Sequence, residues 1–128
     1  MQENKQLKLL VVDDEESIVD YTMKIYARKG FVTFGAKDGL TAVEIFRKEK
    51  PDISLIDINM PYSPFDGIET LRKIKELDKD ALCIMVTCSS DSKNVEKARS
   101  LGACAYIFKP VRIEEIDKVI SQVRGNNR

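Results

Sequence analysis

The stretch KLLVVDDEES, residues 8–17, runs four apolar residues directly into four acidic ones. The continuous apolar run from Leu9 to Val12 is typical of a strand that is buried on both faces. Two of the carboxylates that follow repel each other by roughly 4 kcal/mol when they lie about 4 Å apart at an effective dielectric of about 20. A buried strand that ends in such a cluster of charge therefore predicts a compensating group nearby.

Further short apolar runs, many of them β-branched, follow along the chain. Together with the first run they predict strands at residues 7–12, 31–36, 53–58, 82–87 and 105–108. After each strand lies a segment with apolar residues at helical spacing, and Gly30 and Gly102 stand directly after two of these segments, where glycine commonly ends a helix. Five alternating strand and helix patterns predict an α/β domain with a doubly wound parallel sheet.

The composition limits the class of protein. The chain has 128 residues, 43% of them hydrophobic and 33% charged, which predicts one globular domain over residues 1–128. Because 21 basic residues balance 21 acidic ones, we expect no direct contact with nucleic acid. No apolar run has the length of a signal peptide or approaches the roughly 20 residues of a membrane span, so we expect a cytoplasmic domain without membrane contact.

The chain has three cysteines, at positions 83, 88 and 104, and their spacing is not that of a metal site. Cys83 and Cys104 lie inside apolar runs. We therefore expect both to be reduced residues of the core, as is usual in a cytosolic protein.

Polar residues that are suited to binding or catalysis lie at or just after the ends of four of the predicted strands. Asp13 and Asp14 follow the first, Asp57 lies in the third, Thr87 ends the fourth and Lys109 follows the fifth. In an open parallel sheet these carboxyl ends meet at one edge, where ligands bind. One ammonium does not balance three carboxylates, so the pattern predicts a hard divalent cation, and Mg²⁺ suits a site of carboxylates, waters and a phosphoryl oxygen.

The alternative reading for Asp13 or Asp14 alone is that a carboxylate caps the following helix. The three acids taken together with Thr87 and Lys109 favour a site that accepts a phosphoryl group. The cation, the ammonium and the hydroxyl would spread over the transferring oxygens, and Asp57 would be the nucleophile.

These residues stand in motifs that resemble the receiver domain of two-component response regulators. The motifs are the acidic pair in VVDDEE, Asp57 in LIDINMP, Thr87 in IMVTCSS and Lys109 in AYIFKP, and the resemblance covers essentially the whole chain. It implies a CheY-like, flavodoxin-like fold in which five helices surround a five-stranded parallel sheet of order 2-1-3-4-5.

The resemblance also implies a role for each acidic residue. Asp57 would be the phosphoacceptor. Mg²⁺ would bind Asp14, Asp57 and the backbone carbonyl of Asn59 directly, and Asp13 through a water molecule.

A switch is implied at the fourth and fifth strands. Thr87 would move toward the bound phosphoryl group beside Lys109, and Tyr106 would follow it from an outward to an inward rotamer. Ordinary strand packing is the alternative for Tyr106. The Lys109-Pro110 bond resembles one that is cis in the family.

The function implied is that of a signalling switch activated by phosphorylation, rather than an enzyme, although it assists its own phosphorylation and dephosphorylation. A sensor histidine kinase or a phosphotransfer protein would supply the phosphoryl group, and a downstream protein or an output domain would sense the change. A phosphorylation-dependent homodimer is a further possibility from the family.

Two other functions use similar architectures. An aspartyl-phosphate phosphohydrolase would have a second acid two residues after the nucleophile, where this chain has Asn59. A flavin carrier would have an anion-binding loop after the first strand, where this chain is acidic.

The segment MPYSPFDG, residues 60–67, is two residues longer than is common in the family. The extra length is either harmless in a surface loop, or it lets Tyr62 and Phe65 form an apolar contact for a partner. Asp66 is expected to be the N-cap of the third helix.

Residues around the predicted site also depart from the family. Cys88 stands where a smaller residue is common, and a bulkier thiol there would affect access to the phosphoryl group. With Asn59 and Ser89 it is expected to tune the lifetime of the acyl phosphate.

Overall fold

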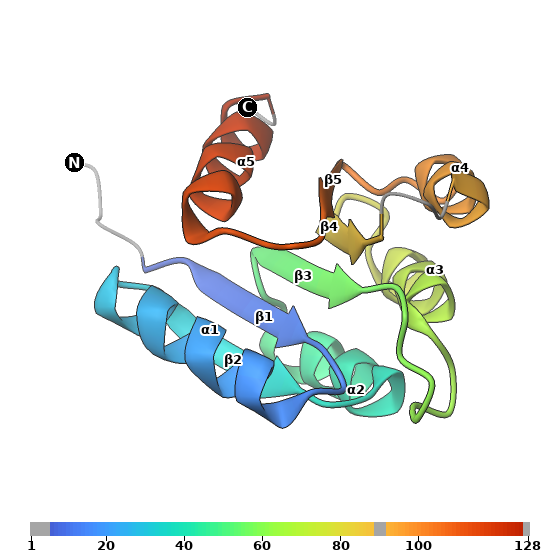
Figure 1. Ribbon diagram of the computed structural model, residues 1–128, viewed down its shortest axis with the longest axis horizontal. Coiled ribbons are helices and arrows are strands. Elements are labelled where there is room, and N and C mark those ends of the chain that lie inside the picture. Colours follow the sequence, from blue (N-terminus) through green and yellow to red (C-terminus); the bar gives the residue numbers. More distant parts are fainter. Residues whose placement is uncertain (1–5, 89–91, 127–128) are drawn as a thin grey trace.

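The computed structural model describes residues 6–88 and 92–126. In this part of the chain five parallel strands form one sheet in the order β2-β1-β3-β4-β5. Helices α1 and α5 cover one face of the sheet, and α2, α3 and α4 cover the other (Figure 1). This arrangement confirms the doubly wound sheet and the strand order that were expected.

The strands lie within one residue of their predicted positions. Their bounds are Lys8–Val12 for β1, Val32–Ala36 for β2, Ile53–Asp57 for β3, Leu82–Thr87 for β4 and Ala105–Phe108 for β5. The predicted bounds of β4 and β5 are confirmed. The first three strands are each shorter by one residue, because Leu7, Phe31 and Ile58 lie outside the regular ladder.

The helices follow the predicted order. Their bounds are Glu16–Arg28 for α1, Gly39–Glu49 for α2, Gly67–Leu77 for α3, Ser92–Ser100 for α4 and Ile113–Asn126 for α5. Gly30 and Gly102 both have φ of +99°, a left-handed conformation that glycine adopts without strain, which confirms them as stop signals. Lys50 ends α2 in the same region at φ 50°, where the sequence carries no glycine signal. Within the described residues, no helix is both long and apolar enough to cross a membrane.

The core has two layers, one on each side of the sheet. Successive side chains of a strand point to opposite faces, so Leu10 and Val12 pack toward α2, α3 and α4, whereas Leu9 and Val11 pack toward α1 and α5. These four residues of β1 are at most 4% exposed. The central strands are therefore held from both sides, which fixes the positions of the residues at their carboxyl ends.

One of the two cysteine predictions is wrong. Cys83 of β4 is fully buried, as expected, but Cys104 is exposed. Cys104 lies just before β5, which is an edge strand of the sheet and has a neighbouring strand on only one side. Its apolar neighbours in the sequence therefore do not bring it into the core. Both thiols are free.

Candidate functional site

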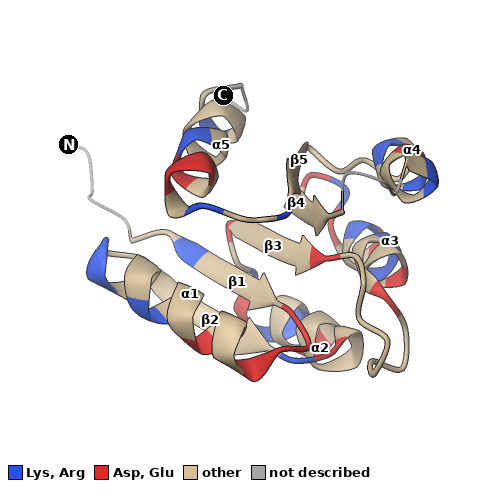
Figure 2. Cartoon of the chain, in the orientation of Figure 1, with Lys and Arg blue, Asp and Glu red and all other residues tan. Residues whose placement is uncertain are grey.

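Three carboxylates converge at the carboxyl edge of the sheet. Asp13 and Asp14 directly follow β1, and Asp57 is the last residue of β3. One carboxylate oxygen from each of the three lies within 4.8 Å of those of the others. In Figure 2 acidic residues mark the ends of the β1 and β3 arrows, which are neighbours in the sheet. The convergence predicted from the strand order is confirmed.

Asp57 is a buried carboxylate with few partners. Its side chain is 3% exposed, and the ammonium of Lys109 lies 3.3 Å from each of its two oxygens. The N–H of Asn59 donates to Oδ1 at 3.2 Å. Burial, and then the charge of Asp13, raise the pKa of Asp57 to about 6, although Lys109 opposes the shift. Near pH 7 the carboxylate is ionised, and the interactions with Lys109 and Asn59 do not fully offset the cost of burying its charge.

The two acids after β1 differ in their surroundings. Asp13 is 7% exposed and accepts a hydrogen bond from the N–H of Glu15 at 2.9 Å. Burial raises its pKa. Oδ2 of Asp14 is buried and has no hydrogen-bond partner in the described part of the chain. Glu15 is the N-cap of α1 and makes no side-chain cap bond. A capping role therefore does not account for the unpartnered oxygen of Asp14.

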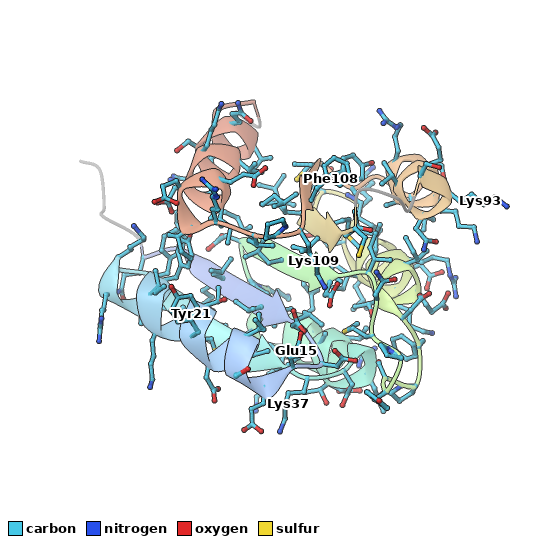
Figure 3. All side chains as sticks on the ribbon, in the orientation of Figure 1. Glu15, Tyr21, Lys37, Lys93, Phe108 and Lys109 are labelled. Atoms are coloured by element: carbon cyan, nitrogen blue, oxygen red, sulfur yellow. The ribbon has the colours of Figure 1, made fainter. Side chains whose placement is uncertain are left out.

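Lys109 follows β5 and reaches the same edge of the sheet (Figure 3). Its backbone N–H donates to the carbonyl of Thr87 at 2.9 Å, and the bond to Pro110 is cis, as the family resemblance implies. Burial alone would lower the pKa of Lys109, but the carboxylates of Asp57 and Asp13 outweigh it and raise the pKa. The lysine is therefore protonated and brings one positive charge to three carboxylates.

Thr87 and Tyr106 lie on neighbouring strands beside this cluster. Thr87 is fully buried at the end of β4, and its hydroxyl lies 3.4 Å from the carbonyl of Cys88. Tyr106 of β5 is half-buried and packs against the core beneath α2, α3 and α4, and its hydroxyl has no hydrogen-bond partner in the described residues. The guanidinium of Arg99 lies 5.6 Å from the centre of its ring. The switch role of both residues stays a prediction.

The rim of the site contains a contact that the sequence did not reveal. Nδ2 of Asn59 lies 3.8 Å from Sγ of Cys88, and both residues are exposed. They are 29 residues apart and follow two neighbouring strands, β3 and β4. Ser89, the third residue predicted to tune the site, lies outside the described residues.

The longer loop after β3 is attached to the start of α2. The hydroxyl of Ser63 accepts from the N–H of Gly39 at 2.8 Å and donates to the carbonyl of Phe65 at 2.6 Å. Phe65 packs against the core, whereas Tyr62 is 91% exposed. Of the two aromatics considered as a partner contact, Phe65 is therefore used mainly in packing.

The start of α3 packs directly against the backbone of Asp57. Oδ1 of Asp66 accepts from the N–H of Glu69 at 3.0 Å, which confirms the predicted N-cap. A Cβ atom on Gly67 would lie 2.2 Å from the carbonyl oxygen of Asp57 and 2.6 Å from Cα of Ile58. Sequence reasoning missed this role of Gly67, for which the glycine next to a capping aspartate was the available signal.

The whole-chain comparison decides the family. The sequence model of the response regulator receiver domain matches residues 9–121. The chain belongs to this family. It is 33% identical over 115 residues to sporulation initiation phosphotransferase F of Bacillus subtilis, covering 90% of this chain and 91% of that protein. It is 34% identical over 116 residues to chemotaxis protein CheY of Halobacterium salinarum, covering 91% and 95%.

Solved structures agree with this assignment. A CheY-like receiver domain protein from Methanospirillum hungatei superimposes with a TM-score of 0.89 at 28% identity, covering 96% of this chain and 97% of that one. The receiver domain also resembles part of longer proteins. It is 30% identical to regulatory protein AtoC of Escherichia coli and spans 24% of that protein's length.

Membership fixes the general function. Receiver domains are phosphorylation-dependent signalling switches and not classical enzymes, and this receiver domain is such a switch. The phosphohydrolase alternative is not favoured. Receiver domains bind Mg²⁺ at an acidic pocket, and the described part of this chain has an acidic cluster of Asp13, Asp14 and Asp57.

Proposed function

We propose that Asp57 is the phosphoacceptor of this receiver domain. The observation that supports the proposal is its buried carboxylate, held 3.3 Å from the ammonium of Lys109 and grouped with Asp13 and Asp14. When the donor is a phosphorylated histidine, an oxygen of Asp57 attacks phosphorus, the bond from phosphorus to the histidine nitrogen breaks, and an acyl phosphate forms. Lys109 is placed to neutralise charge on the transferring oxygens.

A metal ion fits the donor set. Three carboxylates and one ammonium leave an excess of negative charge, and Asp14 offers a buried oxygen that has no protein partner. We assign Asp14, Asp57 and the backbone carbonyl of Asn59 as direct ligands of Mg²⁺, and Asp13 as a ligand through water. When bound, Mg²⁺ neutralises charge on the carboxylates and on the phosphoryl oxygens.

The signal leaves the site through β4 and β5. The hydroxyl of Thr87 would bind a phosphoryl oxygen, and the space that it vacates would admit a rearrangement of Tyr106 on the neighbouring strand. The two residues lie on paired strands, with Tyr106 in register with Met85. Such a switch needs two states that differ by a few kcal/mol, and the phosphoryl group shifts the balance between them. Asn59, Cys88 and Ser89 would tune how long the acyl phosphate lasts.

The partners follow from the family and the chemistry. A sensor histidine kinase or a phosphotransfer protein supplies the phosphoryl group in the cytoplasm. A downstream protein or an output domain senses the change at α4, β5 and α5, and homodimerisation on phosphorylation is one form of that change. The balanced charge of 21 basic and 21 acidic residues supports a protein partner for this domain rather than nucleic acid.

Incubation with acetyl phosphate tests the proposal. We expect the intact mass of the wild type to rise by one phosphoryl group in the presence of Mg²⁺, and not in the presence of EDTA. Asp57→Asn should remain unlabelled, because an amide is not a nucleophile for this reaction. Asp66→Asn removes a nearby exposed carboxylate but keeps a good N-cap, so it should be labelled as the wild type is. Labelling that survives EDTA or Asp57→Asn would contradict the proposal.

A further inference from the structure

Cys83 of β4 and Cys104, the residue just before β5, lie side by side away from the carboxyl edge of the sheet. The register of β4 and β5 begins with Ile84 opposite Ala105, and Cys83 and Cys104 each stand one residue before this pair. The N–H of Cys104 donates to the carbonyl of Cys83 at 3.0 Å, which places the two residues next to each other just outside the regular ladder of β4 and β5. The sequence separates the two thiols by 21 residues, and the fold brings them together.

Both side chains lie on the same face of the sheet. Cys83 packs in the core layer beneath α2, α3 and α4, and Tyr106 packs against that layer. Because side chains alternate along an extended chain, Cys104, two residues before Tyr106, shares its face. Sγ of Cys104 lies 3.4 Å from the carbonyl oxygen of Cys83, so the sulfur leans toward β4.

The usual distance between neighbouring strands suits a disulfide. Neighbouring strands lie about 4.8 Å apart, and bridged cysteines have Cα atoms about 4.4 to 6.8 Å apart. The Cβ atoms must approach to about 3.8 Å. Cys104 precedes the first residue of β5 and lies at the edge of the sheet, so it is the partner with room to make this adjustment.

The two thiols differ in access to solvent. Cys104 is exposed, whereas Cys83 is fully buried. Burial raises the pKa of Cys83 to about 12 and also raises that of Cys104, and the nearby ammonium of Lys75 opposes both shifts. Since thiolates are the reactive form, both cysteines react slowly, and the exposed one meets an oxidant first.

We propose that Cys83 and Cys104 form an intramolecular disulfide when the protein meets hydrogen peroxide or an organic peroxide. The sulfur of Cys104 attacks one peroxide oxygen, the O–O bond breaks, and a sulfenic acid forms while water or an alcohol leaves. The sulfur of Cys83 then attacks the sulfur of that sulfenic acid. The S–O bond breaks, and the hydroxyl leaves as water with the thiol proton of Cys83.

The disulfide would link β4 covalently to the residue just before β5, close to Tyr106. It would therefore restrain the relative movement of the two strands that carry the proposed switch. Its formation does not require Asp57 or a metal ion. The Asp57→Asn variant should consequently form the disulfide as the wild type does, so a failure of this inference is distinguishable from a failure of the proposed phosphorylation.

The test treats the full chain with hydrogen peroxide and maps its cysteines by mass spectrometry after digestion without reductant. We expect a peptide containing Cys83 linked to one containing Cys104 within a monomeric chain, a loss of two free thiols per chain, and recovery of both with dithiothreitol. Cys88→Ser should retain the linkage. Cys104→Ser, a change at an exposed position, should abolish it while the circular dichroism spectrum of the fold is unchanged.

Three results would overturn the inference. The first is Cys83 remaining reduced while Cys104 proceeds to sulfinic acid. The second is a linkage that forms only between two chains, or through Cys88. The third is a folded Cys104→Ser variant that still loses two thiols per chain.

Discussion

Asp57→Asn is expected to stabilise the protein by about 3 kcal/mol near pH 7 in the absence of Mg²⁺. The pKa of Asp57 is raised from 3.8 to about 6 in the folded state. A raised carboxyl pKa means that the fold disfavours the ionised form, so the charge costs stability. About two pKa units at about 1.4 kcal/mol each give this magnitude.

The pH dependence of this effect has a definite sign. Below about pH 4 the carboxyl is protonated in both the folded and the unfolded chain, so its charge costs nothing there. The cost grows as the pH rises from 3.8 to about 6 and is constant above that. The difference in unfolding free energy between Asp57→Asn and the wild type should therefore reach about 3 kcal/mol at pH 7.5 and be nearly absent at pH 3.5.

Urea unfolding in EDTA at several pH values measures this difference. Asp66→Asn is the matched control, because it removes a carboxylate at an exposed helix cap, and we expect little change from it. Adding Mg²⁺ should stabilise the wild type by preferential binding to the folded state. The difference in unfolding free energy between Asp57→Asn and the wild type should therefore become smaller. Equal unfolding free energies of the two proteins at pH 7.5, or a difference that persists at pH 3.5, would show that the ionised carboxylate of Asp57 does not destabilise the fold.

Gly67→Ala is expected to destabilise the protein by about 1–3 kcal/mol, the usual range for overpacking. The added Cβ would lie 2.2 Å from the carbonyl oxygen of Asp57 and 2.6 Å from Cα of Ile58. Both are backbone atoms, so either α3 or the end of β3 must move. Because this backbone carries the phosphoacceptor, we also expect slower labelling by acetyl phosphate.

Gly125→Ala is the control for the same change of residue. Gly125 lies in α5, and an added Cβ there would meet nothing within 4 Å. Alanine should therefore leave stability unchanged or raise it by up to about 1 kcal/mol through helix propensity. Urea unfolding compares the two variants. If Gly67→Ala were as stable as Gly125→Ala and labelled at the wild-type rate, the close packing of α3 against Asp57 would not limit the site.

Much of the fold was predictable because the apolar runs and their breaks are local signals. The continuous run of β1 indicated a strand covered on both faces, and Gly30 and Gly102 marked the ends of two helices. The end of α2 at Lys50 was not predictable, since a lysine in the left-handed region has no distinct pattern. Cys104 was wrongly placed because an apolar run in an edge strand looks the same as one in a central strand.

The candidate site also has features that were predictable from the sequence and features that were not. Asp57 and Lys109 were predicted to meet because parallel topology alone brings strand ends to one edge, and the structure places them 3.3 Å apart. The contact between Asn59 and Cys88 depends on the paths of two loops. The fit of Gly67 depends on how closely a helix approaches a strand. Neither loop paths nor interlayer distances are encoded in a local pattern.

The central claim is that the carboxylate cluster makes Asp57 the phosphoacceptor in a Mg²⁺-dependent reaction. Borohydride reduction tests it most directly, because the reagent converts a phosphorylated aspartate to homoserine, and mass spectrometry then locates the converted residue. After treatment with acetyl phosphate and Mg²⁺, we expect homoserine at position 57 alone, and none when EDTA replaces Mg²⁺. Conversion at Asp13 or Asp14, or a phosphoryl label that resists borohydride, would contradict the claim.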